Sequence, residues 1–154
     1  MTELLAKDIM TKKVITINQE ASIQQLSQLL LDNRISGVPV VDNEGKMVGI
    51  ATEGDIIVKD ADLHFPRYFK LLDGIIYLES LTKFKNSLKK HLAIKVSEIM
   101  TENVISCSPE TPVYDVANLM IENRVNRIPV VDKDGKPAGI ITRADIVKSM
   151  VQNK

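Results

Sequence analysis

Two short motifs of the same form carry the groups in this chain that could do chemistry. Each is a threonine followed three residues later by an aspartate, at Thr52 and Asp55 and again at Thr142 and Asp145, directly after a strand-like run containing Gly-Ile. A helix that begins at such a threonine presents unpaired backbone N–H groups and a positive dipole end, which together favour an anion. An aspartate beside that anion suits a nucleotide, because a carboxylate binds ribose hydroxyls while the helix end faces phosphate.

The same motif also has a purely structural interpretation. Thr-x-x-Asp is close to a capping box, in which the hydroxyl caps backbone N–H groups and the acidic residue lies in the first turn. Three features favour binding instead. The helix N-terminus after a strand is a ready anion site. Gly49 and Gly139 let another group approach the backbone closely, while Gly54 and Ala144 keep the first helical turn slim. The third is the aspartate beside that site, which suits a nucleotide better than phosphate alone. Both interpretations stay open from the residues alone.

The motif occurs twice because a long segment of the chain is duplicated. Ile9–Ile56 maps onto Ile99–Ile146 at a constant offset of 90 residues without a gap. A repeat of this length indicates one supersecondary unit used twice. Two such units can pack face to face around a pseudo-two-fold axis, and any site at their seam is then doubled.

Each copy predicts the order β-α-β-β-α after a short amphipathic turn, so we expect an α+β fold of two packed units. The turns cover 6–10 and 96–100, and the first strands cover 14–17 and 104–107. The helices carry apolar residues at Ile23, Leu26, Leu29 and Leu30 and at Val113, Val116, Leu119 and Met120. Thr111 is expected to cap the second of these helices ahead of Pro112, and Asn33 and Asn123 to end them in the left-handed conformation.

The two remaining strands of each copy are expected to form a hairpin. They cover 38–42 and 47–51 in the first copy and 128–132 and 137–141 in the second. Gly45 and Gly135 occupy the same place in the two turns, where a positive φ is needed. These hairpins lead directly into the two Thr-x-x-Asp motifs.

Composition excludes several classes of function. The 154 residues contain 20 basic and 20 acidic side chains, so no net field attracts nucleic acid or an anionic membrane. No apolar run is long enough to span a membrane and no secretory signal is present, so we expect a cytoplasmic protein. The lone Cys107 matches Ile17 of the first copy and is expected in the core, with no metal site.

An unduplicated segment separates the copies. We expect repeat 1 at residues 1–58, a partly helical insert at 59–95 and repeat 2 at 96–154. Apolar spacing predicts an amphipathic helix over Asp73–Leu92, flanked by Lys83, Lys85, Lys89 and Lys90 on a solvated face. His64 and His91 are too isolated to indicate a metal and are expected at the surface or its boundary.

The duplicated motifs resemble those of a pair of cystathionine-β-synthase (CBS) domains, the tandem often called a Bateman module. The resemblance lies in D-I-M-T and E-I-M-T (8–11, 98–101), S-G-V-P-V-V-D and N-R-I-P-V-V-D (36–42, 126–132), and G-I-A-T-E-G-D and G-I-I-T-R-A-D (49–55, 139–145). Several linked motifs recur twice in the same order, which makes the match specific. The insert is not part of the resemblance.

The resemblance implies two clefts between the repeats that bind adenosine-type ligands, with AMP, ADP or ATP expected and no cofactor or catalytic residue. One cleft would use Thr142, Arg143 and Asp145 with Ala21, Ser36, Gly37, Val38 and Pro39. The other would use Thr52 and Asp55 with Thr111, Asn126, Arg127, Ile128 and Pro129. Because Arg143 stands where Glu53 stands, we expect the first cleft to bind a nucleotide more tightly. Arg127 is expected either to offset Glu53 or to fill space.

The sequence leaves three functions to consider. A non-catalytic sensor that binds adenine nucleotide and relays this to a separate protein explains the doubling and the neutral charge. A purely structural or oligomerising module, with Thr-x-x-Asp serving only as helix caps, is the alternative. An enzyme is disfavoured because no histidine is duplicated and no nucleophile–base pair is suggested. The resemblance also implies a homodimer, as a flat disc of four repeats.

Overall fold

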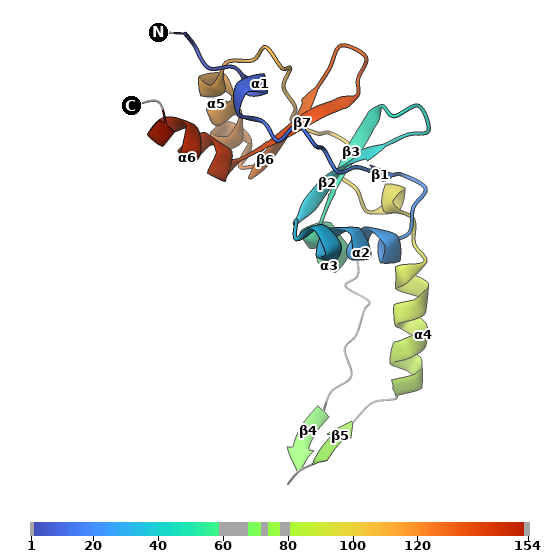
Figure 1. Ribbon diagram of the computed structural model, residues 1–154. Coiled ribbons are helices and arrows are strands. Elements are labelled where there is room, and N and C mark those ends of the chain that lie inside the picture. Colours follow the sequence, from blue (N-terminus) through green and yellow to red (C-terminus); the bar gives the residue numbers. More distant parts are fainter. Residues whose placement is uncertain (1, 59–67, 72–73, 78–80, 153–154) are drawn as a thin grey trace.

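The computed structural model describes residues 2–58, 68–71, 74–77 and 81–152, and it contains two similar units side by side (Figure 1). The elements of the first unit are α1 (Ala6–Ile9), β1 (Ile17–Asn18), α2 (Ile23–Asn33), β2 (Gly37–Val41), β3 (Met47–Thr52) and α3 (Glu53–Val58). Those of the second are η1 (Val96–Glu98), α5 (Val113–Asn123), β6 (Arg127–Val131), β7 (Pro137–Thr142) and α6 (Arg143–Gln152). The predicted α+β class with two packed repeats is confirmed.

The two sheets have the same pairing pattern. In the first unit β1 is parallel to β2, which is antiparallel to β3, with Gly37 opposite Thr52. In the second unit β6 is antiparallel to β7, with Arg127 opposite Thr142. A single parallel bridge from Cys107 to Val130 replaces β1 there. The first strands are therefore shorter than the sequence predicts.

The hairpin turns confirm the role predicted for their glycines. Gly45 has φ +81° and Gly135 has φ +80°, a region that other residues rarely adopt. Asp42 Oδ1 accepts hydrogen bonds from the backbone N–H groups of Glu44 and Lys46, and Asp132 does the same in the second turn. The backbone N–H of Met47 donates to the Gly135 carbonyl at 2.9 Å, so the two hairpins lie side by side.

Each unit has its own hydrophobic core, and the predicted helix faces supply it. In α2 the side chains of Ile23, Leu26 and Leu30 are buried, and in α5 those of Val116 and Met120 are buried. The other predicted apolar residues of these helices are partly buried against the same cores. Cys107 is 9% exposed inside the second core, as predicted from its equivalence to Ile17.

The first turn of each unit completes the core of the other unit. Ala6 of α1 is fully buried in the second core, and its backbone N–H donates to the Thr111 carbonyl at 2.8 Å. Val96 of η1 is fully buried in the first core, and its N–H donates to the Ala21 carbonyl at 2.7 Å. This exchange ties the two repeats together, and the sequence did not predict it.

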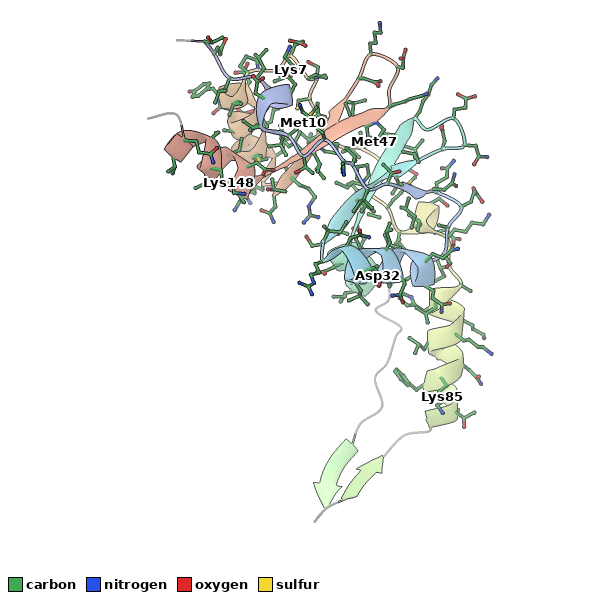
Figure 2. All side chains as sticks on the ribbon, in the orientation of Figure 1. Lys7, Met10, Asp32, Met47, Lys85 and Lys148 are labelled. Carbon is green, nitrogen blue, oxygen red and sulfur yellow. The ribbon has the colours of Figure 1, made fainter. Side chains whose placement is uncertain are left out.

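The exchange also explains the glycines of β3 and β7. The Sδ of Met100 lies 2.7 Å from where a Cβ on Gly49 would be, and the Thr101 carbonyl oxygen lies 2.8 Å from it. Met10 occupies the same position against Gly139 in β7 (Figure 2). The group that approaches these glycines closely is therefore a methionine of the exchanged segment.

The helix ends differ from the prediction at three residues. Pro112 occupies the N-cap of α5, and Thr111 instead uses its hydroxyl to accept from the Ser108 N–H at 3.1 Å. The left-handed residues are Arg34 (φ 52°) and Arg124 (φ 54°), one position after the predicted asparagines. Asn33 and Asn123 end the helices differently, because their side-chain amides donate to the carbonyls of Leu29 and Leu119.

The prediction of a single helix over Asp73–Leu92 in the insert is wrong. The strands β4 (Tyr68–Leu71) and β5 (Gly74–Tyr77) form an antiparallel hairpin, and α4 spans only Leu81–Leu92. Figure 1 shows α4 leading away from α2, with the hairpin beyond it, and Figure 2 shows Lys85 on that helix. His91 is 5% exposed, which corrects its expected surface position. His64 lies outside the described residues.

Candidate functional site

Two clefts lie at the seam between the repeats, and each takes residues from both. The smaller, here the Thr52 cleft, has a volume of about 420 Å³. Its first-repeat walls come from the junction of β3 and α3 and from Ser36. Its second-repeat walls come from two segments, one after η1 and one at the start of β6. The second-repeat residues are Thr101, Asn103, Val104, Ile105, Val125, Asn126 and Arg127.

The larger cleft, here the Thr142 cleft, has a volume of about 710 Å³ and is built in the mirrored way. Its second-repeat walls come from the junction of β7 and α6, with Asn126 and Arg127. Its first-repeat walls come from the segment after α1, from the end of α2, from the start of β2 and from Glu53. Many residues of these walls have an equivalent, 90 positions away, that lines the Thr52 cleft. They include Thr11, Lys13, Ile15, Ile35, Ser36, Gly37, Ile140, Thr142, Arg143 and Ala144.

The two Thr-x-x-Asp motifs form the hydrogen bonds of helix caps. The Asp55 Oδ2 accepts from the backbone N–H of Thr52 at 2.9 Å and from its hydroxyl at 3.1 Å. The Asp145 Oδ2 accepts from the N–H and hydroxyl of Thr142 at 2.8 and 3.0 Å. The aspartate side of a capping box is therefore present in both repeats, and in the first the Thr52 hydroxyl also accepts from the Asp55 N–H at 3.2 Å. In each motif both of these bonds from threonine end on the same carboxylate oxygen, Oδ2.

Nine predicted site residues line the clefts in the arrangement that the sequence suggested. The Thr142 cleft brings together Thr142, Arg143, Ser36, Gly37 and Pro39, and the Thr52 cleft brings together Thr52, Asp55, Asn126 and Arg127. Each cleft therefore joins the strand–helix junction of one repeat to the start of a strand in the other.

Six predicted residues do not line either cleft. Val38, Ile128 and Pro129 are fully buried, because strand alternation turns the two aliphatic side chains into the cores. Ala21 and Thr111 pair with the exchanged turns instead. The Ala21 carbonyl accepts from the Val96 N–H of η1, and the Thr111 carbonyl accepts from the Ala6 N–H of α1. Asp145 does not line the Thr142 cleft, and its Oδ2 accepts from the Thr142 N–H and hydroxyl as a helix cap.

The sequence reasoning missed one wall of each cleft. Thr11, Lys13 and Ile15 line the Thr142 cleft, and Thr101, Asn103 and Ile105 line the Thr52 cleft. These residues alternate along the segment between the exchanged turn and the first strand. The signal for them was present in the repeated I-M-T triplets, which end at Thr11 and Thr101.

Arg127 lies at the seam between the clefts and lines both of them. Its Nη2 donates to the Ser36 hydroxyl, and its guanidinium covers Gly37. The side chain thus fills the space that the absent side chain of Gly37 leaves, which was one of the two expectations for it.

Neither a metal centre nor a membrane span is found in the described part of the chain. No three His, Cys, Asp or Glu side chains gather there in a way that could hold a metal ion. None of the helices described there is long and apolar enough to cross a bilayer.

Comparisons with known proteins agree with this geometry. The CBS domain model matches residues 6–62 and 96–152. An uncharacterized protein of Methanocaldococcus jannaschii is 36% identical over 155 residues, covering 96% of this chain and 92% of that protein. The CBS domain pair of protein MJ0100, in complex with 5′-methylthioadenosine and S-adenosyl-L-methionine, superposes with a TM-score of 0.71 at 29% identity, covering 99% of this chain and all of that one. The CBS-pair protein CBSX2 from Arabidopsis thaliana gives 0.75 at 25% identity, covering 99% and 97%.

Proposed function

The chain belongs to the CBS domain family, and on that premise we propose that it is a regulatory module that binds adenosine-type nucleotides in its two seam clefts. The observation that carries the proposal is the doubled cleft, in which the strand–helix junction that begins with Thr52 or Thr142 in one repeat meets a strand start of the other. The MJ0100 pair supports it, since that protein holds two adenosyl compounds.

In the proposed complex the predicted residues keep their roles. Asp55, which lines its cleft, and Asp145, two residues after the lining residue Arg143, bind the ribose through carboxylate oxygen. Where the ligand carries phosphate, the threonine of the motif faces it together with nearby cations such as Arg143. Capping does not exclude ribose binding, because an ionised carboxylate has about four lone-pair sites and the two threonine bonds occupy part of them. We propose AMP, ADP or ATP as the ligand.

Titration of the purified protein with AMP, ADP and ATP tests this function. Isothermal calorimetry should detect binding, and a ligand at 100 times its Kd should raise the free energy of unfolding by about 2.7 kcal/mol. Native mass spectrometry of the protein as purified would report a carried ligand directly. If none of the three nucleotides binds or stabilises the protein, the purely structural module is the correct function.

We further propose that the module catalyses no reaction on its ligand and acts by relaying its occupancy to a separate protein. Among the described residues the two best nucleophile or base candidates are withdrawn from the clefts, since Cys107 and His91 are both buried elsewhere. Nucleotide recovered unchanged after prolonged incubation supports this. Any conversion of ATP to ADP or AMP that depends on the protein contradicts it.

The exposed helix faces support a homodimer of two chains. Leu31 and Ile121 are equivalent residues that are 72% and 74% exposed, and Ile57 and Val147 are an equivalent pair that is 75% and 59% exposed. Both repeats thus present the same apolar positions to solvent, as expected where a second chain covers them. Analytical ultracentrifugation of the wild type and of Val147→Asp tests this. The wild type should sediment as a dimer and the variant as a monomer.

A further inference from the structure

The two clefts differ in charge at positions that the repeat makes equivalent. Lys13 in the Thr142 cleft corresponds to Asn103 in the Thr52 cleft, and Arg143 corresponds to Glu53. Several other equivalent wall residues are identical in the two repeats, among them the pairs Thr11 and Thr101, and Thr142 and Thr52. The two clefts therefore have the same architecture but different charges.

The full set of charged wall residues makes the contrast larger. The Thr142 cleft is lined by four cations, Lys13, Arg34, Arg127 and Arg143, and by one carboxylate, Glu53. The Thr52 cleft is lined by one cation, Arg127, and by two carboxylates, Glu53 and Asp55. Counting Asp145, the equivalent of Asp55, with the Thr142 cleft still leaves that cleft with two more cations than carboxylates. The first cleft attracts a polyanion, and the second repels one.

Arg127 cannot remove this difference. Its guanidinium already lies between the clefts, covering Gly37 and donating to the Ser36 hydroxyl on the first-repeat side. The same residue lines both clefts, so it adds one positive charge to each and leaves the contrast between them unchanged.

The volumes differ in the same sense as the charges. The cationic cleft measures about 710 Å³ and the acidic one about 420 Å³. A nucleoside carrying a chain of phosphates needs both more room and more positive charge than a nucleoside alone. Charge and size thus both favour the Thr142 cleft for the ligand that carries the phosphates.

Building on the proposed function, we propose that the Thr142 cleft selects a nucleoside di- or triphosphate, and that the Thr52 cleft selects an adenosyl compound without phosphate. In the first cleft Lys13 and Arg143 pair with the phosphate oxygens. In the second, Glu53 and Asp55 favour ribose hydroxyls or a cationic group and disfavour phosphate. One chain then senses two ligand classes at once.

Binding of ATP, AMP and adenosine to the wild-type protein gives the first test. ATP should bind more tightly than AMP at one site per chain, and adenosine should bind at a second site whether or not ATP is present. Raising the salt from 0.05 to 0.5 M should weaken ATP binding about tenfold or more and leave adenosine binding nearly unchanged, because screening acts on the charged ligand. Competition between ATP and adenosine for a single site overturns the assignment.

Exchange of the equivalent residues gives the second test. The double variant Lys13→Asn, Arg143→Glu gives the Thr142 cleft the residues of its counterpart, and it should lose ATP affinity at least tenfold while adenosine still binds. Glu53→Arg with Asn103→Lys should add a second ATP site. Lys133→Glu with Lys136→Asn makes the same change of three charge units on an exposed hairpin turn outside both clefts; it is the control and should leave ATP affinity within twofold.

The outcomes separate this inference from the proposed function. Binding of ATP that neither salt nor the Lys13→Asn, Arg143→Glu variant weakens overturns the charge assignment and leaves nucleotide binding intact. Failure of ATP, AMP and adenosine alike to bind the wild type overturns both.

Discussion

The guanidinium of Arg127 lies directly over Gly37, and the two residues hold the same position in the two repeats. The Arg127 Cζ is 3.0 Å from where a Cβ on Gly37 would lie. Gly37 pairs with Thr52 and Arg127 pairs with Thr142, so this contact joins the starts of both hairpins at the seam. The missing side chain of one repeat accommodates the long side chain of the other.

Gly37→Ala should therefore destabilise the protein through Arg127. The added methyl group would overlap the guanidinium and lie 3.0 Å from the Thr52 Cγ2, and overpacking of this kind costs about 1–3 kcal/mol. Because the guanidinium is the end of a flexible side chain, Arg127→Ala should remove much of the loss. Urea unfolding of the two single variants and the double variant measures this coupling. Equal losses from Gly37→Ala in both backgrounds would show that Arg127 is not the cause.

Alanine substitution of three other glycines should give three different results. Gly49→Ala should be the most damaging, by about 1–3 kcal/mol, because the Thr101 carbonyl 2.8 Å away is backbone and cannot move aside. Gly139→Ala should be partly rescued by Met10→Ala, because that change removes the Met10 Sδ and Cγ, the two atoms nearest the new methyl group, and leaves the Met10 Cβ at 3.0 Å. Gly54→Ala is the control: its nearest atom lies at 3.5 Å, so it should stabilise α3 by about 0.5–1 kcal/mol. Thermal or urea unfolding ranks the three variants.

The features predicted well from the sequence are those that local patterns determine. The buried face of α2 follows from the spacing of Ile23, Leu26 and Leu30, and the hairpin turns follow from Gly45 and Gly135. The exchange of α1 and η1 could not be predicted this way. Each amphipathic turn suits either core equally well, because the two repeats present nearly the same apolar surface.

Local patterns also explain why some cleft residues were predicted wrongly and others were not predicted. Val38 and Ile128 were assigned to the clefts through the resemblance, but both are fully buried because alternation along a strand turns them inward. Lys13 was missed because it lies outside any regular element. In the insert, the helical spacing that began at Asp73 competed with the β preference of Ile75 and Ile76, and the strand prevailed.

Asp145→Asn should separate the ligand role of the aspartate from its capping role. The amide oxygen of asparagine can still accept from the Thr142 N–H, so the free energy of unfolding should stay within about 0.5 kcal/mol of the wild type. The lost charge should weaken ATP binding about tenfold or more, as expected for a charged hydrogen bond to ribose.

The matched variant is Asp55→Asn in the other repeat, which has the same capping bonds. Calorimetric titration of both variants with AMP and ATP compares the two clefts. A greater loss of ATP binding from Asp55→Asn than from Asp145→Asn would reverse the predicted ranking of the clefts.

Cys107 should be almost unreactive in the folded protein. Its side chain is 9% exposed in the second core, and burial raises the pKa of the thiol from 9.0 to about 11. At pH 8 the thiolate fraction is then about 100-fold lower than in the unfolded chain, and the thiolate is the reactive form. Because the chain has one cysteine, alkylation by iodoacetamide reports on this residue alone. It should be slow in native buffer and fast in urea, whereas fast alkylation in native buffer would place the thiol outside the core.

The same shift predicts a loss of stability at high pH. The thiol holds its proton more tightly in the folded state, so its contribution is complete below pH 9 and is lost as the pH rises through about 11. The two-unit shift limits that loss to about 2–3 kcal/mol. Cys107→Val has a similar volume and no proton to lose, so its free energy of unfolding should fall less than that of the wild type between pH 9 and 11. Urea unfolding at several pH values measures the difference, and parallel curves for the two proteins would mean that the thiol does not titrate from a buried site.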